Sequence, residues 1–118
     1  MSEFNIQTAT EDGVCHIRLT GRVTFTMSRR FDAFIEALFE DTLSDIVVDL
    51  RKADHLDSTM LGLLAKIARL FIARYHRKPT LLSTREDITL LLDSMGFDSA
   101  FTICPHTPAV PFYLEDIP

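Results

Sequence analysis

The spacing of apolar residues changes along the chain and separates predicted strands from predicted helices. In residues 14–20 every second side chain is apolar, as expected of a half-buried strand. Residues 4–8 precede this strand across Glu11-Asp12-Gly13, a cluster typical of tight turns. The pattern therefore predicts a β-hairpin at the start of the chain.

Three later segments carry apolar residues three or four positions apart, the spacing of amphipathic helices. The predicted helices cover residues 28–41, 58–76 and 84–95. Thr26 or Ser28 is the expected N-cap of the first helix. The third helix begins with two overlapping capping boxes, which pair a hydroxyl with an acidic residue three positions later: Ser83 with Glu86, and Thr84 with Asp87.

Short apolar runs between these helices predict the remaining strands. Residues 46–50 suit a central strand buried on both faces, residues 80–82 follow Pro79, and residues 97–103 return to the sheet edge. The element order is ββαβαβαβ, and strands that alternate with helices pair in parallel through right-handed crossovers. The predicted fold is an α/β domain with a small mixed sheet packed with amphipathic helices.

Length and composition indicate one domain. The chain has 118 residues, and its 47% hydrophobic content is enough for a core without disulfides or metals. We assign residues 1–104 to the domain and residues 105–118, which hold four of the five prolines, to a C-terminal tail. The tail is expected to be extended, and residues from 108 onward to be dispensable for folding.

The charge balance narrows the choice of partners. A net charge of −5 argues against nucleic acids and anionic membrane surfaces as ligands. No run of 18 apolar residues is present, so membrane insertion is not expected, and the start of the chain lacks the pattern of a signal peptide. Cys15 and Cys104 form no disulfide framework, and we expect a cytoplasmic protein.

Ser58 is the most informative candidate for chemistry. It follows the strand at residues 46–50 and a polar loop, and it begins the second predicted helix. The carboxyl ends of parallel strands are where α/β proteins keep their functional sites, and a helix N-terminus favours a phosphate. A phosphorylated Ser58 would add roughly −1.5 to −2 charges beside Asp54 and Asp57. The alternative is that Ser58 is only the N-cap of its helix.

Other combinations of reactive residues do not form recognisable sites. His55, Asp57 and Ser58 have the residue types of a catalytic triad, but neighbours on one loop do not align as one. The cysteine and histidine pairs at 15–16 and 104–106 lack zinc-site spacing, and no glycine-rich phosphate loop is present. We therefore expect a protein that is not an enzyme and that binds neither a metal nor a cofactor.

One stretch resembles the signature of the STAS-domain family, typified by bacterial anti-sigma factor antagonists. In that family a strand ending in Asp-Leu leads to Asp-Ser-Ser or Asp-Ser-Thr and then to a Gly-Leu-rich helix. This chain has Val48-Asp49-Leu50, then Leu56-Asp57-Ser58-Thr59, then Leu61-Gly62-Leu63-Leu64. Gly21 matches the family's turn from the second strand into its first helix, and the resemblance extends over residues 4–103.

The resemblance implies a role for each residue near this stretch. Ser58 is the implied phosphoacceptor, with Thr59 as a weaker alternative. Two positions differ from many members, which have Gly in place of Met60 and Asp in place of Thr24. Arg29 and Arg30 oppose the macrodipole of the first helix, either as solvated side chains or as partner contacts. The implied partner-binding residues are Arg22, Thr24, Asp57, Ser58, Thr59 and Met60.

The function implied by the resemblance is that of an anti-sigma factor antagonist in a bacterial partner-switching circuit that regulates transcription. The unphosphorylated protein would bind the anti-sigma factor, and phosphorylation at Ser58 would prevent binding. The expected partners are the anti-sigma factor, which often is itself the serine protein kinase, and a metal-dependent serine phosphatase. The alternative is a cytoplasmic STAS subunit of a transporter complex, an assembly module in which Ser58 need not be phosphorylated.

Overall fold

A mixed sheet of six strands, in the order β5-β4-β3-β2-β1-β6, forms the centre of the computed structural model. The structure describes residues 4–106, 111 and 113–118. Among these residues the order of elements confirms the predicted ββαβαβαβ succession and adds a final short strand. The elements are β1 (Asn5–Glu11), β2 (Val14–Val23), the 3₁₀ turn η1 (Phe25–Met27), α1 (Ser28–Leu38), β3 (Asp45–Leu56), α2 (Ser58–Tyr75), β4 (Thr80–Leu82), α3 (Glu86–Ser94), the 3₁₀ turn η2 (Phe97–Ser99), β5 (Thr102–Cys104) and β6 (Glu115–Asp116).

The strand pairing follows the sequence prediction. β1 and β2 form the predicted antiparallel hairpin, whose turn residues Asp12 and Gly13 have φ angles of 53° and 79°. Two successive left-handed residues give the turn the twist that a two-residue hairpin needs. β3 pairs in parallel with β2 and β4, and β4 pairs in parallel with β5 at the sheet edge.

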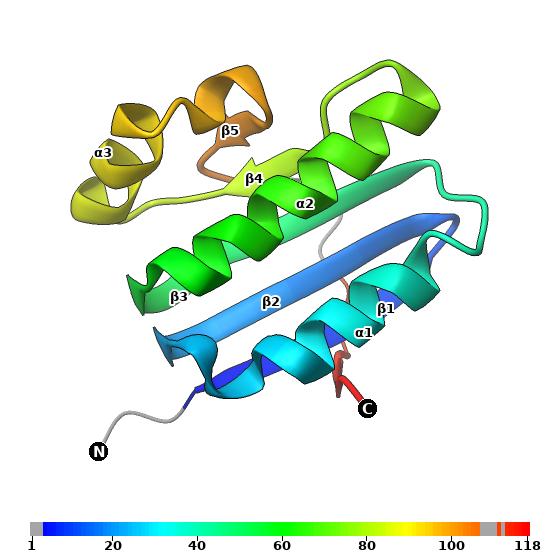
Figure 1. The fold of residues 1–118 in the computed structure, drawn as a ribbon, viewed down its shortest axis with the longest axis horizontal. Helices are drawn as coiled ribbons and strands as arrows, with labels where there is room; N and C mark the ends of the chain where they lie inside the picture. The colour runs from blue at the N-terminus through cyan, green and yellow to red at the C-terminus, as the bar shows by residue number, and fades with distance from the viewer. Residues whose placement is uncertain (1–3, 107–110, 112) are drawn as a thin grey trace.

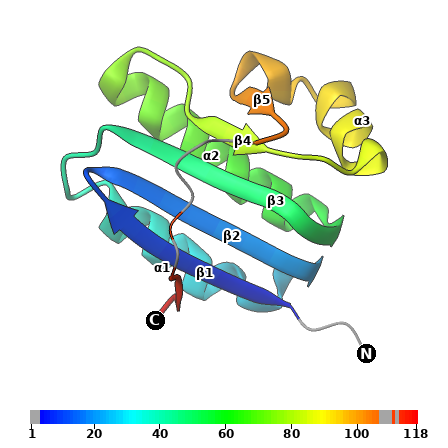
Figure 2. The same cartoon turned by 180° about the vertical axis from the view of Figure 1, so that it is seen from behind.

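The helices α1 and α2 lie side by side over one face of the sheet (Figure 1), whereas no helix of the described residues covers the opposite face (Figure 2). Because α1 and α2 each present an apolar stripe, the core forms between them and the sheet. Ile17 pairs in register with Val48, and both are fully buried, as are Phe31 from α1 and Phe71 from α2.

Two strands are longer than their sequence pattern predicted. β3 continues to Leu56 beyond the apolar run, so residues 51–56, expected in a polar loop, are strand. β2 likewise reaches Val23, and Gly21 lies inside it, with a φ of 84° where the register against β3 shifts. The backbone pairing of β2 with β3 keeps the polar residues at the ends of both strands extended. The apolar pattern of one strand does not reveal its pairing with another, so the sequence did not predict these extensions.

The predicted helix caps are wrong for α1 and α3. The N-cap position of α1 is Met27, which has no capping side chain, because η1 leads directly into the helix. The N-cap position of α3 is Arg85, also without a side-chain cap. The Ser83 hydroxyl instead bonds with the Thr89 hydroxyl at 2.7 Å. Ser83 is held at the end of the sheet, where its N–H donates to the carbonyl oxygen of Cys104, so it cannot cap the following helix.

The end of the chain joins the sheet. β6 pairs with β1, and the side chain of Ile117, only 2% exposed, belongs to the core. Arg30 of α1 donates to the carbonyl oxygen of Ile117 at 2.9 Å and to a carboxyl oxygen of Pro118 at 3.2 Å, which gives this first-turn cation a role inside the molecule. Because Ile117 is in the core, the part of the tail that was expected to be dispensable includes a core residue. The domain boundary after residue 104 stays a prediction. Residues 107–110 and 112 lie outside the described part of the chain.

Candidate functional site

The carboxyl ends of β2 and β3 meet at the start of α2. Val23 pairs with Leu56, the last residues of the two strands, and only Asp57 separates β3 from α2. Ser58 and Thr59 are exposed in the first turn of the helix, as the sequence predicted. Met60, by contrast, is fully buried in the core, which removes it from the partner-facing surface on which we expected it.

Asp57, and not Ser58, is the N-cap of α2. Its backbone is extended, and its Oδ1 accepts a hydrogen bond of 2.9 Å from the N–H of Met60. Its Oδ2 accepts a second bond, of 2.7 Å, from the N–H of Phe25 at the start of η1. The N–H of Asp57 donates to the carbonyl oxygen of Val23. One carboxylate therefore fastens the segment between β2 and α1 to the helix that carries Ser58, and it leaves the Ser58 hydroxyl without a capping role.

The structure brings the other predicted contact residues to the same end of the sheet. Arg22 is exposed and pairs in register with His55, directly before the junction. The Thr24 hydroxyl lies 3.3 Å from the hydroxyl of Thr26. The polar residues around the junction of β2, β3 and α2 are together called the switch surface: Arg22, Thr24, Asp57, Ser58 and Thr59.

The charge beside the switch surface is partly compensated. Asp54 lies on β3, and its carboxylate pairs with Arg85 at 3.3 Å. Arg85 also forms two hydrogen bonds of 2.9 Å with Asp87. These bonds from Arg85 hold the pKa of Asp87 below its ordinary value. Arg85 thus lies between two carboxylates, those of Asp54 and Asp87, beside the switch surface.

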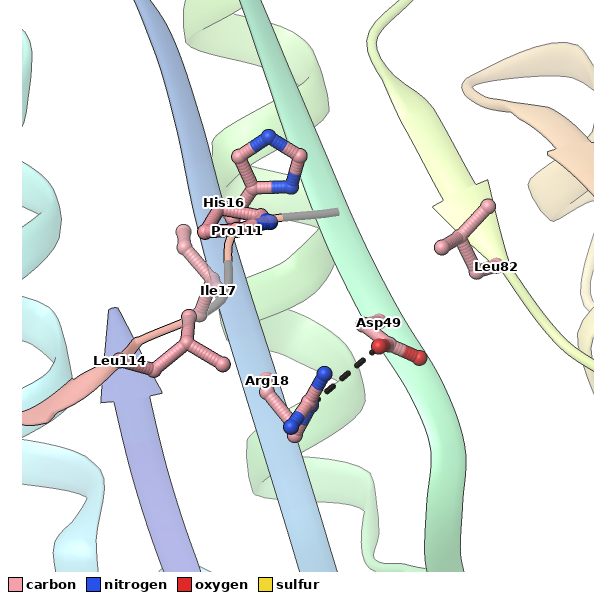
Figure 3. Close-up of a pocket in the computed structure, with 7 residues that line it drawn as sticks. All are labelled: His16, Ile17, Arg18, Asp49, Leu82, Pro111 and Leu114. Atoms are coloured by element: carbon pink, nitrogen blue, oxygen red, sulfur yellow. Dashed lines mark hydrogen bonds and ion pairs between the residues drawn. The ribbon is translucent and has the colours of Figure 1, made fainter. Parts of the chain in front are cut away.

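A second polar cluster lies on the helix-free face of the sheet (Figure 3). The buried carboxylate of Asp49 accepts hydrogen bonds of 2.9 Å from the Nε and the second terminal nitrogen of Arg51, and a longer one from Arg18. Burial alone would raise the pKa of Asp49, but the hydrogen bonds and charge of Arg51 outweigh it and lower the pKa. Pro111 and Leu114 from the end of the chain help to line a cavity of about 10 Å³ beside this cluster.

The cluster around Asp49 is structural. Across the described residues no buried polar side-chain atom lacks a hydrogen-bond partner. The buried carboxylate of Asp49 is therefore fully paired by its neighbours, as expected of an ion cluster that stabilises the fold. Sequence reasoning did not single it out. The sequence does contain a signal for this cluster, because Asp49 lies within the apolar run of residues 46–50. An acidic side chain in a buried strand needs cationic partners.

Triad and metal chemistry have no geometric basis in the described residues. Both carboxylate oxygens of Asp57 accept from backbone N–H groups, and among the described residues no hydrogen bond joins them to the exposed ring of His55. Among the described residues, no three or more histidine, cysteine or acidic side chains lie close enough together to bind a metal ion. Burial raises the pKa of the Cys15 thiol. No helix in the described part of the chain is both long and apolar enough to cross a membrane.

The family model for the STAS domain matches residues 5–109. The chain belongs to the STAS domain family. This match confirms the family that the sequence signature suggested, and the α/β fold with a mixed sheet and three described helices agrees with it. A comparison with curated proteins returns no match.

Solved structures of anti-sigma factor antagonists share the fold of this STAS domain. One from Mycobacterium paratuberculosis superposes with a TM-score of 0.71 at 19% identity, covering 88% of this chain and 87% of that one. Unphosphorylated SpoIIAA gives 0.69 at 19% identity, covering 89% and 90%. The phosphorylated form of SpoIIAA, a Bacillus cell fate determinant, gives 0.67 at 17% identity, covering 86% and 91%. At these identities the likeness shows the fold.

Proposed function

We propose that this STAS domain is an anti-sigma factor antagonist that binds its anti-sigma factor when unphosphorylated and is switched off by phosphorylation at Ser58. The observation that carries the proposal is the exposed Ser58 hydroxyl in the first turn of α2, one residue after Asp57, which links the end of β3 to the helix. Membership of the STAS family and the fold shared with antagonists support it. Thr59, exposed beside Ser58, is the weaker phosphoacceptor candidate.

Ser58 suits the role of a phosphoacceptor better than that of a catalytic nucleophile. Within the described residues, none of the hydrogen bonds brings a base to its hydroxyl, whereas a nucleophilic serine needs one to remove its proton. A serine kinase would supply that base, transfer the terminal phosphoryl group of ATP to Oγ and take up the proton. A metal-dependent serine phosphatase would hydrolyse the resulting ester and restore the hydroxyl.

The switch operates through charge at an interface. In the unphosphorylated protein, Ser58 and Thr59 present neutral hydroxyls that a partner can cover at low cost. A phosphate adds roughly −1.5 to −2 charges, and desolvating them without a pairing cation is expensive. Asp54 and Asp57 add like-charge repulsion within the Debye length of roughly 8 Å at physiological salt. Phosphorylation therefore weakens the complex without unfolding the domain.

Isothermal titration calorimetry against the purified anti-sigma factor of the host tests this function. Wild type and Ser58→Ala are expected to bind alike, and Ser58→Asp is expected to lose at least about 100-fold in affinity. Ser99→Asp serves as the matched control and is expected to bind like the wild type, since it makes the same change at an exposed serine of η2, outside the switch surface. Equal affinities for wild type, Ser58→Ala and Ser58→Asp would reject the switch. Capture of a transporter subunit instead of an anti-sigma factor would favour the assembly role.

A further inference from the structure

The outer edge of β1 lacks the features that normally protect an edge strand. β1 forms an unbroken series of pairs with β2, without a bulge. Its seven residues include no proline and no lysine, and the only charged one, Glu11, stands at the end. A long, regular and nearly uncharged edge favours pairing with a further strand. The opposite edge of the sheet is less prone to such pairing, because β5 has only three residues.

β6 covers the middle of this edge and supplies the missing charge. Its two residues, Glu115 and Asp116, pair with β1 and are both exposed. Charged side chains on an edge strand oppose the addition of another strand. Pro118 follows, and proline offers no backbone N–H to a neighbour. Figure 2 shows this end of the chain beside β1, and we call residues 113–118 the edge cap.

The edge cap is held by few contacts. Ile117 fills a site in the core, and its N–H donates to the carbonyl oxygen of Ile6 at 3.1 Å. Arg30 of α1 donates to oxygens of Ile117 and Pro118. The edge cap lies outside residues 5–109, the part of the chain that the STAS family model matches. A short element with so few hydrogen bonds opens at a lower free energy than the central strands.

A second copy of β1 fits the edge that the edge cap covers. Two identical edges pair antiparallel about a two-fold axis. In a pair centred on Thr8, Asn5 of each copy lies opposite Glu11 of the other, so no two like charges meet. The carbonyl oxygen of Ile6 faces outward, because it accepts from the edge cap. Backbone groups alternate in direction along a strand, so those of Thr8 and Thr10 also face outward, towards the second copy.

We propose that the edge cap keeps this chain monomeric by blocking an antiparallel pairing of β1 between two copies, and that opening of the cap forms this dimer. The partner that fits the uncovered edge is therefore a second copy of the same chain. Opening removes Glu115 and Asp116 from the edge and joins the two sheets into one. The inference goes beyond the proposed function and does not depend on it, because the surface is the edge of β1 and not the switch surface.

Sedimentation velocity of the whole 118-residue chain over a series of concentrations tests the edge cap. The wild type is expected to be monomeric. Arg30→Ala removes the bonds from α1 to the end of the chain, and Ile117→Ala removes its anchor in the core. Each variant is expected to self-associate at least about tenfold more tightly than the wild type. The matched controls, expected to behave like the wild type, are Arg69→Ala at an exposed arginine of α2 and Tyr113→Ala at an exposed side chain of the edge cap. Thermal melting of all four variants checks that they are folded.

A proline in β1 identifies the surface through which the variants associate. Thr10→Pro removes an N–H that faces outward, and an edge strand tolerates proline at such a position. Added to Arg30→Ala, this change is expected to restore the monomer. A dimer that survives it pairs through another surface and would overturn the inference.

Two further results bear on the edge cap. The inference is wrong if Arg30→Ala and Ile117→Ala stay folded and monomeric, or if the wild type associates as tightly as they do. Hydrogen exchange of the wild type measures the opening directly. After correction for intrinsic rates, the amide of Ile117 is expected to exchange at least about tenfold faster than that of Val48 in β3. Equal protection would show that the edge cap opens only when the whole domain unfolds, and it would also overturn the inference.

Discussion

At the scale of single residues, Asp57 connects two parts of the chain that sequence spacing does not relate. Its two oxygens accept from the N–H groups of Met60 and Phe25, which lie 3 and 32 residues away. The first bond satisfies a free donor of the helix, and the second fixes the turn before α1. The carboxylate thus sets the geometry of the switch surface.

We predict that Asp57→Ala lowers the free energy of unfolding by about 1–2 kcal/mol, because it removes a helix cap and leaves the N–H of Phe25 without its acceptor. Chemical denaturation measures the change. Asp57→Asn, which keeps a capping oxygen, should lose less. Ser58→Ala should have little effect, because Ser58 does not cap the helix. A larger loss for Ser58→Ala than for Asp57→Ala would contradict this assignment.

His16 makes stability depend on pH. Its side chain lines the same small cavity as Pro111 and Leu114. Burial lowers the pKa of His16 from the ordinary 6.5. The negative charges of Glu11, Asp45 and Asp49 act to raise this pKa, and the positive charge of Arg18 acts to lower it. A lowered pKa in the folded state means that the unfolded chain binds the proton more tightly. The stabilisation is therefore present above about pH 6.5 and is lost as the pH falls through and below this value.

The melting temperature of the wild type should consequently fall between pH 7.5 and 5.5. His16→Gln should show a smaller fall, because glutamine does not titrate. Differential scanning calorimetry at a series of pH values measures both. Parallel curves for the two proteins would exclude His16 as a source of the dependence.

At the scale of elements, α2 contains a glycine that nothing inside the molecule requires. Gly62 is exposed, its φ is not in the left-handed region, and an added Cβ would meet no atom within 4 Å. Glycine inside a helix is less stable than alanine because the unfolded chain has more freedom to lose. Its place one turn after Ser58 puts bare backbone next to the switch surface.

Gly62→Ala should raise the free energy of unfolding by about 0.5–1 kcal/mol. The matched control is Gly96→Ala, which is expected to be destabilising because Gly96 has a φ of 76°. Urea denaturation of both variants measures the two signs. A loss of stability in Gly62→Ala would show that the position is constrained within the domain.

The short strand β6 is the element whose contribution the sequence pattern underestimated. Ile117 donates its N–H to the carbonyl oxygen of Ile6, and its side chain fills a site in the core. Ile117→Ala should therefore lower the free energy of unfolding by about 2 kcal/mol. Tyr113→Ala is the control, since Tyr113 is 67% exposed. Equal melting temperatures for Ile117→Ala and wild type would restore the view that the tail is dispensable.

At the scale of the whole molecule, the switch surface lies at one end of the sheet, outside the core between the sheet and the two helices. Ser58 is exposed, and the charge of Asp at a helix start is favoured by the dipole. Ser58→Asp should unfold in one cooperative transition, within about 0.5 kcal/mol of wild type. Circular dichroism melting measures this. A broad or early transition would show that lost binding reflects unfolding.

The sequence by itself determined the succession of elements, the parallel pairing of the strands that alternate with helices, and the position of Ser58. These features depend on periodicity and on turn residues such as Asp12 and Gly13, which act within a few residues of themselves. The family signature at residues 48–64 could be recognised for the same reason, because it is a local order of residues. Ser58 stands in the first turn of α2, as predicted from that order.

Only the tertiary structure decided that Asp57 also holds the turn before α1, how far β3 extends and where the end of the chain lies. Asp57 holds this turn because β2 brings the N–H of Phe25 to it, and β3 reaches Leu56 because β2 pairs with it. Ile117 joins the core because the edge of β1 accepts a further strand. Each depends on contacts between residues far apart in the chain, and such contacts leave no periodic signal in the sequence.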